Sequence, residues 1–482
     1  MIPFVGFAPD SAPESPGVFL QCTNIIPDFG KFISAPSPVD CNLGAVESAA
    51  KGFSINAKLD GTNRTFCGVA AKLYERVSGV WSDVSKVGGY TLSTDNRWRF
   101  AQFGNVSLAV AKSDTLQSTA SGNFADASAS APKADIVELI NNQVFLFNIN
   151  GMGFGDDLTR WACSAVGSHT DFTPSISTGC VSGQLLDSPG AITAGKRLGD
   201  IIVAYKAKAM YVGQYVGTPA WWSFTRVPGD IGTPVQEAVV NTGTAHFFIG
   251  PDDFYIFDGT RPTPLNSPCR GWFFATIDQA YMHRIAGTFD RINQRAYWWF
   301  PAKNSNGALT QCVVYNVKTG QWGRIDLEIE CVGEYVSAGV TIDGLTAYSA
   351  TIDGLPDVPY DSPFWTSGAS VVTVFKADHK AYQLSGVSGE SRIVTGHYGD
   401  NIQFSTCSRV RPRFIKSPAS STLIYSYSND DASNFTTNIR STYQKQWYDL
   451  IWSARWHKYE LVFQGNHAIS GFDLVMSQDG SE

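Results

Sequence analysis

The fold is decided by the stretch Val314-Tyr315-Asn316-Val317-Lys318-Thr319-Gly320-Gln321-Trp322. An apolar run ends at Tyr315-Asn316, Lys318-Thr319-Gly320 provide the residues of a tight turn, and Trp322 begins the next strand. Outward from this hairpin, short apolar or alternating runs separated by Gly, Asp, Asn and Ser continue on both sides, from about Leu59 onward. The pattern predicts strand after strand, and therefore an all-β fold.

The strands gather into clusters that recur about every 40–50 residues, which is the length of one propeller blade. Turn signals occur in the first two clusters, at Gly104-Asn105 and at Asn141-Asn142. The clusters cover residues 63–117, 136–164, 200–224, 246–259, 296–324 and about 331–384. We therefore expect a β-propeller-like main domain. The clusters do not align letter for letter, so the number of blades stays open.

Three regions follow from changes of pattern along the chain. Residues 1–58 are rich in Pro and Gly at the front and predict an extended N-terminal arm. Residues 59–390 form the propeller-like domain, and the longer alternating runs in residues 391–482 predict an accessory C-terminal β-sandwich. At the end of the first cluster, residues 114–131 are rich in Ser and Ala and predict a mobile loop that hangs from this cluster.

Composition supports a β protein and argues against one class of nucleic-acid binder. The 482 residues are 43% hydrophobic, 13% aromatic and only 16% charged, with 45 Gly and 30 Phe, which suits many short strands joined by tight turns. A net charge of -7 argues against a protein that grips nucleic acid through its phosphates, since such surfaces are basic. A duct through which DNA slides remains compatible with this charge.

The cysteines and the hydropathy of the chain indicate in which cellular compartment the protein is made. The nine cysteines include no Cys-x-x-Cys pair and no Cys/His cluster, so we expect free, buried thiols. No apolar stretch approaches the roughly 20 residues of a membrane helix, and the first residues lack the pattern of a secretory signal. We expect a protein made in a reducing cytoplasm, without membrane insertion.

A search for chemistry identifies no catalytic, metal-binding or cofactor-binding residues. The seven histidines share no ligand-like spacing, and no Gly-x-Ser-x-Gly, Walker or His-Glu-x-x-His motif occurs. Neighbouring side chains on a strand point to opposite faces, so adjacent carboxylates indicate turns rather than acid/base couples. These pairs are Asp156-Asp157, Asp252-Asp253 and Asp430-Asp431.

Adjacent aromatic residues have two explanations. They could stack on sugars or bases, but one ring in the core and the other between packed sheets or subunits is favoured. The pairs are Trp221-Trp222, Trp298-Trp299 and Trp447-Tyr448.

One charged feature is a candidate contact site. Arg409, Arg411 and Arg413 alternate in a strand, which places their guanidinium groups on one face, and Pro412 between them predicts an edge strand. Charges that keep an edge from pairing with another chain are the favoured explanation. The functional alternative is a contact with an acidic partner subunit or with DNA.

The order of elements resembles the nozzle, or packaged-DNA stabilisation, proteins of short-tailed bacteriophages over nearly the whole chain. The step from Tyr315 to Trp322 resembles the third-to-fourth strand step of a kelch blade. Further motifs of the resemblance are Pro3 to Asp10, Cys22-Thr23-Asn24-Ile25-Ile26-Pro27, Phe103-Gly104-Asn105-Val106-Ser107-Leu108-Ala109-Val110, Trp161-Ala162-Cys163-Ser164 and Phe248-Ile249-Gly250-Pro251-Asp252-Asp253-Phe254-Tyr255-Ile256-Phe257-Asp258-Gly259.

This resemblance implies a non-enzymatic structural protein of the virion tail. Its propeller would assemble as a homo-oligomeric ring, a hexamer, below the tail adaptor protein and beside the tail fibre or spike proteins. The ring would close the exit channel for double-stranded DNA, without sequence-specific contact, and open during ejection. Loops facing the axis would form the gate, and residues 114–131 are one candidate.

Two other functions remain open. One is a phage tail protein that binds a receptor or cleaves a glycan, which requires a solvent-facing site of aromatic rings and carboxylates. The other is a cellular kelch-type interaction module. Such modules usually repeat a Gly-Gly pair and a Tyr/Trp pair in every blade, whereas these pairs are sporadic here.

Overall fold

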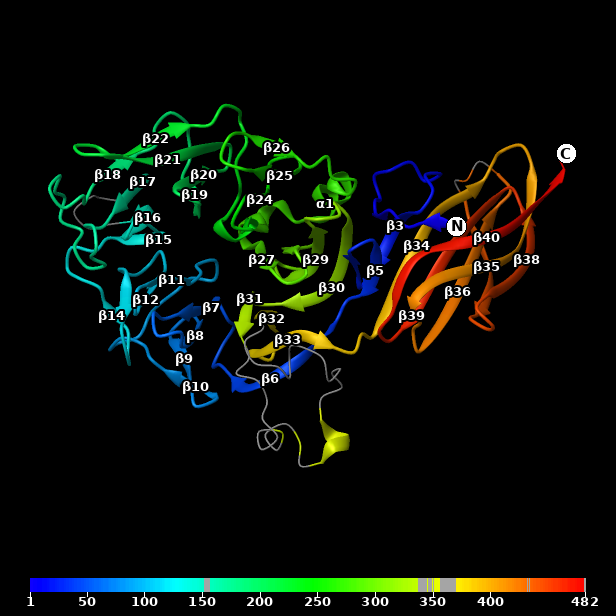
Figure 1. Cartoon of the computed structure of the whole chain (residues 1–482), viewed down its shortest axis with the longest axis horizontal. Helices are drawn as coiled ribbons and strands as arrows, with labels where there is room; N and C mark the ends of the chain where they lie inside the picture. The colour runs from blue at the N-terminus through cyan, green and yellow to red at the C-terminus, as the bar shows by residue number, and fades with distance from the viewer. Residues whose placement is uncertain are drawn as a thin grey trace.

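The computed structural model describes residues 1–150, 157–336, 345, 349, 351–355, 370–430, 432 and 434–480. A ring of small sheets stands beside a C-terminal unit of longer strands (Figure 1). The all-β class and the propeller are thus confirmed. Helical segments in this part of the chain are α1 (Arg270–Thr276), η1 (Gln236–Ala238), η2 (Gln279–Arg284) and η4 (Ile352–Gly354). No helix among the described residues is long and apolar enough to span a membrane.

Among the described residues, six separate four-stranded antiparallel sheets and one four-stranded meander make up the ring. From the inner strand outward, the first three blades are β7 (Gly52–Ala57), β8 (Asn63–Gly68), β9 (Leu73–Val77) and β10 (Val80–Asp83); β11 (Arg99–Phe103), β12 (Val106–Val110), β13 (Gln117–Thr119) and β14 (Ala125–Asp126); and β15 (Lys133–Ile140), β16 (Gln143–Asn150), β17 (Asp157–Cys163) and β18 (Ser182–Gln184).

The next blades continue the same in-to-out order. They are β19 (Ile192–Leu198), β20 (Ile201–Lys206), β21 (Ala209–Gly217) and β22 (Trp221–Arg226); β23 (Val239–Asn241), β24 (His246–Ile249), β25 (Phe254–Phe257) and β26 (Pro262–Pro264); the meander β27 (Ala286–Asp290), β28 (Arg295–Pro301), β29 (Leu309–Asn316) and β30 (Trp322–Ile329); and β31 (Cys331–Val336), β32 (Ser370–Phe375), β33 (Lys380–Gly386) and β6 (Ser37–Ala45). The inner strands β7, β11, β15, β19, β23, β27 and β31 follow one another round the axis, and β31 contacts β7 again.

The turns that the sequence predicts lie where expected. Gly104 and Asn105 connect β11 to β12, with Phe103 opposite Val106. Asn141 and Asn142 both have left-handed φ angles, 50° and 58°, between β15 and β16, which is the geometry of a tight hairpin. Tyr315 and Trp322 are cross-strand partners in β29 and β30, the third and fourth strands of their meander.

Aromatic side chains fill the spaces between neighbouring blades. Phe66, Trp98 and Phe124 belong to one buried cluster between the first two blades, and similar clusters lie between the later pairs. Gly68 is required at this packing, because a Cβ there would lie 2.2 Å from the indole of Trp98. The high aromatic content of the chain is therefore a requirement of blade-to-blade packing.

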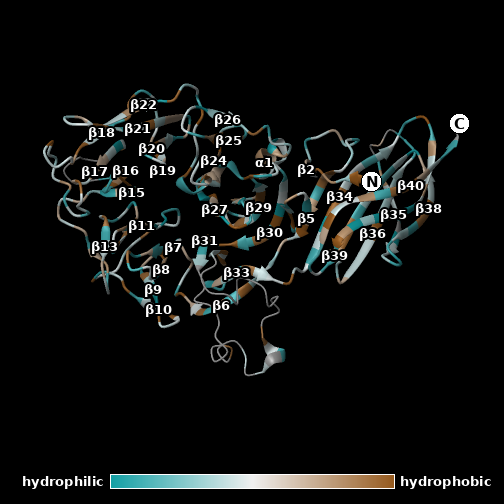
Figure 2. Cartoon of the chain, viewed as in Figure 1, coloured by the Kyte–Doolittle hydropathy of each residue, from teal (hydrophilic) through white to brown (hydrophobic). Residues whose placement is uncertain are grey.

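The C-terminal unit has two sheets. One contains β2 (Gly6–Phe7), β3 (Val18–Thr23), β34 (Glu390–Gly399), β39 (Trp456–Gln464), β36 (Ser420–Ser428) and β37 (Thr436–Thr442). The other contains β5 (Lys31–Ser34), β40 (Ala468–Gly480), β35 (Phe404–Lys416) and β38 (Tyr448–Ala454), with β1 (Ile2–Pro3) on β40. Val410, Leu423, Tyr459 and Phe472 from both sheets share one buried core. Hydrophobic and hydrophilic residues are interspersed along these strands (Figure 2).

The residues 1–58 predicted as an extended N-terminal arm are distributed over several sheets. Strands β1 to β5 belong to the C-terminal unit, β6 is the outermost strand of the last blade, and β7 is already the inner strand of the first. β4 (Ile25–Asp28) pairs with β30 through Ile25 and Arg324, so one ten-stranded sheet crosses from the propeller to β40 and β35. These strands are short and Pro-rich, and their partners lie hundreds of residues away, so no local periodicity reveals them.

The predicted mobile loop of residues 114–131 is wrong. It contains β13 and β14, the two outer strands of the second blade, and the side chains of Leu116 and Phe124 are fully buried. Because outer strands lie farthest from the axis of the propeller, this segment lies away from the centre of the propeller. Its small polar residues lie on the outside of a regular blade.

The junction of β30 with β4 gives a test of the continuous sheet. A Cβ at Gly323 would lie 2.4 Å from the carbonyl oxygen of Ile25, so we expect Gly323→Ala to separate the two strands and to lower the free energy of unfolding by about 1–3 kcal/mol. The thermal unfolding midpoint and protease sensitivity of the N-terminal strands measure this effect. Gly389→Ala is the matched control, because a Cβ added at this residue would have no atom within 4 Å. Equal midpoints for both variants would contradict the prediction.

Candidate functional site

The inner strands of the blades surround a cavity of about 660 Å³ at the propeller axis. Charged side chains of both signs line this axial cavity, although inner strands are otherwise largely apolar. They are Lys51, Arg97, Arg99, Glu138, Lys196, Glu237 and Glu334.

Arg99 is held by two carboxylates from different parts of the ring. Its Nε and Nη2 donate to the two carboxylate oxygens of Glu237 at 2.7 and 3.0 Å, and its Nη1 donates to Asp135 Oδ1 at 2.5 Å. The side chain of Arg99 is only 10% exposed. Burial alone would raise the pKa of Glu237, but the Arg99 guanidinium reverses this effect and lowers the pKa to about 2. The bidentate pair therefore joins the second blade to η1 across the cavity wall.

The remaining charges of the cavity form no ion pair within the described residues. Lys51 Nζ donates to the carbonyl oxygens of Ser93 and Thr94 at 3.0 and 2.7 Å, and burial together with nearby Arg97 lowers its pKa. Arg97 donates only to the main-chain carbonyls of residues 284 and 285. Burial raises the pKa of Glu138. The wall is thus polar and charged, with capacity left for a bound ligand or water.

The size of the axial cavity limits what it can hold. Its volume is in the range of small-molecule sites, about 300–1,000 Å³. A DNA duplex, whose major groove alone is about 12 Å wide, does not fit inside a single propeller.

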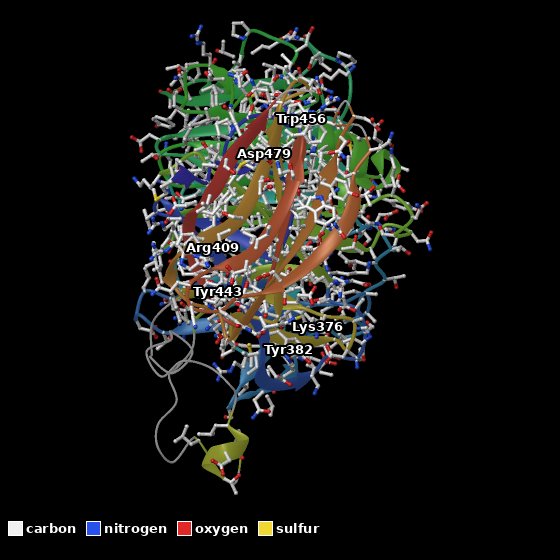
Figure 3. All side chains as sticks on the ribbon, turned by 90° about the vertical axis from the view of Figure 1, so that its right-hand side faces the viewer. Lys376, Tyr382, Arg409, Tyr443, Trp456 and Asp479 are labelled. Atoms are coloured by element: carbon white, nitrogen blue, oxygen red, sulfur yellow. The ribbon has the colours of Figure 1, made fainter. Side chains whose placement is uncertain are left out.

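The three predicted contact residues lie together on β35, and their neighbours Val410 and Pro412 are buried. Figure 3 looks onto the C-terminal unit from the side opposite the propeller and labels Arg409. We call the outward side of β40, β35 and β38 that carries these guanidinium groups the arginine face. Their positions on one side agree with strand alternation.

The partners of the three arginines differ. Arg409 Nε lies 2.7 Å from Asp449 Oδ1, and Arg413 forms an ion pair with Asp473. Arg411 instead donates to Gln446 Oε1 at 2.7 Å, and its guanidinium lies 5.3 Å from the ring centre of Trp447. Arg411 is thus the member of the triplet that has no carboxylate partner among the described residues.

The edge position predicted from Pro412 holds for only part of β35. This strand pairs with β40 along its whole length and with β38 from Ser405 to Val410. Pro412 lies beyond the last β38 pair, where one side of the strand is open. The missing N–H of proline is tolerated there, so the residue marks where the pairing ends.

Other predicted assignments can be located in the structure. Asp252 and Asp253 lie in the turn between β24 and β25, where Tyr255 donates to Asp252 and the N–H of Phe254 donates to Asp253. Asp156 and Asp431 lie outside the described residues. Within the described chain, no group of three or more His, Cys, Asp or Glu side chains is arranged to hold a metal ion.

The cysteine prediction is confirmed, because all nine thiols are free and buried. Burial raises the pKa of Cys22 to about 12, which keeps the thiol protonated and unreactive at neutral pH.

The aromatic pairs divide into two kinds. Trp298 and Trp299 are both fully buried, in separate clusters on opposite faces of β28, as predicted. Trp222 is buried as well, but Trp221 is only partly buried and lines an open cavity together with Tyr215.

Sequence reasoning missed the axial cavity. Its charged residues lie on or next to separate inner strands and form no local motif. A weak signal was present, because Glu138 interrupts the apolar run Ile136-Val137-Glu138-Leu139-Ile140. A charge in the middle of such a run indicates a strand that faces a polar cavity on one side.

Comparisons with known proteins give fold neighbours only. No model of a protein family and no curated protein matches the chain. Among solved structures, the WD40 domain of Pan2 from Neurospora crassa is 8% identical, covers 74% of this chain and 96% of its own, and has a TM-score of 0.40. A streptogramin B lyase is 11% identical over 72% of this chain and 97% of its own, with a TM-score of 0.38. The exo-β-1,3-galactanase of Phanerochaete chrysosporium is 9% identical over 91% of this chain and 100% of its own, with a TM-score of 0.30.

The buried pair at the axis gives a prediction about pH. Arg99→Met leaves Glu237 without its partner, and we expect a loss of about 3–5 kcal/mol in the free energy of unfolding at pH 7. In the natural chain the lowered pKa of Glu237 stabilises the fold above about pH 4.5, and this contribution is lost as the pH falls toward 2. In the variant, burial alone raises the pKa, so the difference between the two proteins should shrink at acidic pH.

Denaturant midpoints of both proteins at pH 7 and pH 3 measure this difference. Arg226→Met is the control, because its pair with Asp230 is exposed and should contribute about 0–1 kcal/mol. A deficit of the same size at both pH values would show that Arg99 acts through packing rather than through charge.

Proposed function

We propose that this chain is the structural nozzle of a short-tailed bacteriophage tail. In this proposal copies of the chain form a ring, a hexamer, below the tail adaptor. The ring closes the exit channel for double-stranded DNA and opens during ejection. Its neighbours are the adaptor and the tail fibre or spike proteins. The resemblance in the order of sequence motifs is the origin of the proposal.

The structural observation that supports it most is the ten-stranded sheet. A subunit in the wall of a duct has to hold its shape while neighbouring subunits and DNA press on it. Here β30, β4, β5 and β40 join the propeller to the C-terminal unit through main-chain hydrogen bonds rather than through a linker. Phe7 and Trp322 lie in one common core cluster, so side-chain packing supports the same junction. Such a body resists bending.

Charge and size bear on the DNA path in this proposal. The axial cavity of one propeller is too small for a duplex, so the path would lie at the centre of the ring of copies. A chain with a net charge of -7 does not bind phosphates tightly, which suits a passage through which DNA slides.

Electron microscopy of the protein, alone and mixed with the adaptor, tests the proposal. We expect six-fold rings around an axial channel at the tail tip. The isolated chain should stay a monomer until it meets a six-fold template, because its net charge disfavours casual association. A stable trimer of the isolated chain would count against the nozzle.

Arg411 gives a sharper test of the assembly surface. Because it has no carboxylate partner among the described residues, Arg411→Glu should leave the thermal midpoint nearly unchanged. If the arginine face contacts an acidic partner, the reversed charge should weaken ring assembly on the adaptor by about tenfold or more. Lys208→Glu is the charge-matched control, since Lys208 lies in the exposed turn between β20 and β21. Assembly that is equal in both variants would remove the arginine face from the interface.

A second candidate function is a tail protein that binds a receptor or cleaves a glycan. The open cavity that contains Tyr215, Trp221 and Asp171 is the observation that favours it, because it combines aromatic rings with a carboxylate. Peripheral trimeric spikes in micrographs and turnover of a host polysaccharide would support this candidate against the nozzle.

A further inference from the structure

The open cavity between the third and fourth blades has a volume of about 780 Å³. It lies where the β15–β16 turn, the loops after β17 and the ends of β21 and β22 meet. We call it the rim cavity. It shares no lining residue with the axial cavity, and its chemistry is the same whether or not the chain is a tail nozzle.

Two aromatic rings, together with Ala165 and Val166, form the apolar part of the rim cavity. Tyr215 is 49% exposed, and its ring centre lies 5.9 Å from that of Trp221 at an interplanar angle of 67°. The indole N–H of Trp221 donates to the carbonyl oxygen of Ile176 at 2.7 Å, which fixes the orientation of this ring. Two inclined aromatic planes therefore stand at the cavity with their orientation set in advance.

The backbone holds Trp221 in an unusual conformation. Its φ angle is +60°, a left-handed value that is rare for a bulky side chain and costs free energy. The ring packs on Gly179, where a Cβ would lie 3.0 Å from the indole and φ is +76°, so glycine is strongly favoured at this position. Trp221 packs with part of its side chain against the buried cluster around Phe145 and Trp222, and the rest of the side chain lines the rim cavity.

A buried amide supports the cavity from below. Gln143 is fully buried, and its Nε2 donates to the carbonyl oxygens of Gly179 and Ser164 at 2.9 and 2.7 Å. Its Oε1 accepts the indole N–H of Trp222 at 2.9 Å. The side chain of Gln143 thus fixes both Gly179, on which Trp221 packs, and Trp222. The rim cavity is a supported structure rather than a gap between loops.

The polar groups of the rim cavity determine the class of ligand. The cavity wall offers the carboxylate of Asp171, the amide of Asn141 and the hydroxyl groups of Ser168, Ser177 and Thr178. No lysine or arginine lines the cavity within the described residues. The absence of cationic groups there disfavours phosphates and other anions. A neutral sugar has an apolar C–H face for the rings and hydroxyl groups for the polar side chains.

We propose that the rim cavity binds a short neutral oligosaccharide. The sugar stacks on Tyr215 and Trp221, and one of its hydroxyl groups donates a hydrogen bond to the carboxylate of Asp171. Asn141 bonds a further hydroxyl group of the sugar. Its side chain is exposed and makes no hydrogen bond within the described structure. No bond in the sugar is broken, because Asp171 is the single carboxylate that lines the cavity within the described residues, whereas glycoside hydrolysis uses a pair.

The test uses the full chain on a printed array of neutral and anionic oligosaccharides, followed by calorimetric titration with the best neutral ligand. Binding should be selective for neutral sugars and should quench tryptophan fluorescence. Tyr215→Ala should weaken it by about tenfold or more. Asn141→Gly removes the amide but suits the left-handed backbone at this position, where φ is 50°, so it should weaken binding while the thermal midpoint is retained.

Tyr382→Ala is the matched control, because Tyr382 is a partly exposed tyrosine on the last blade, labelled in Figure 3, and should leave sugar affinity unchanged. The proposal is overturned if no neutral oligosaccharide of the array binds in the millimolar range. It is also overturned if only anionic sugars bind, or if both substitutions in the rim cavity leave the affinity unchanged.

Discussion

A propeller has a gap where its first and last blades meet, and main-chain hydrogen bonds between β6 and β33 close it here. Asp40 pairs with Tyr382 and Val39 with Gln383, so a strand from the front of the sequence completes the last blade. The closed ring brings β31 against β7 and fixes every inner strand around the axis. The axial cavity and the aromatic clusters between the blades exist only as long as this closure holds.

The same front segment also joins the two bodies of the molecule. β4 and β5 lie between β30 and β40, and β1 to β3 complete the sheets of the C-terminal unit. Fewer than fifty residues therefore close the ring and attach the unit to it. Backbone pairing is cooperative, so the loss of one of these strands removes the partner of the next. A Cβ at Gly323 or at Gly471 would lie within 2.4 Å of a main-chain oxygen of the front segment, so the strands approach each other closely at both positions.

Local signals in the sequence predicted local structure. The turns at Gly104-Asn105 and Asn141-Asn142, the step from Tyr315 to Trp322 and the burial of Trp298 and Trp299 depend on residues that are neighbours in the chain. The arm and the axial cavity depend on residues that are far apart. Ile25 meets Arg324 across about two thirds of the sequence, and Arg99 meets Glu237 across three blades. No periodicity within a window of some 15 residues records such contacts. In the sequence, only the Trp221-Trp222 pair pointed to the rim cavity. The fold then shows that Trp221 is only partly buried and lines this cavity.

Ring closure by β6 also determines when this protein can finish folding during its synthesis. Strand β6 leaves the ribosome long before its partner β33, because about 340 residues separate Asp40 from Tyr382. At about 5–20 residues per second, the front strands wait on the order of tens of seconds with unpaired edges. Contacts between such distant residues also slow folding after release. A growing chain therefore passes through a stage with open blade edges, in which chaperones or neighbouring chains have the opportunity to bind before the ring is complete.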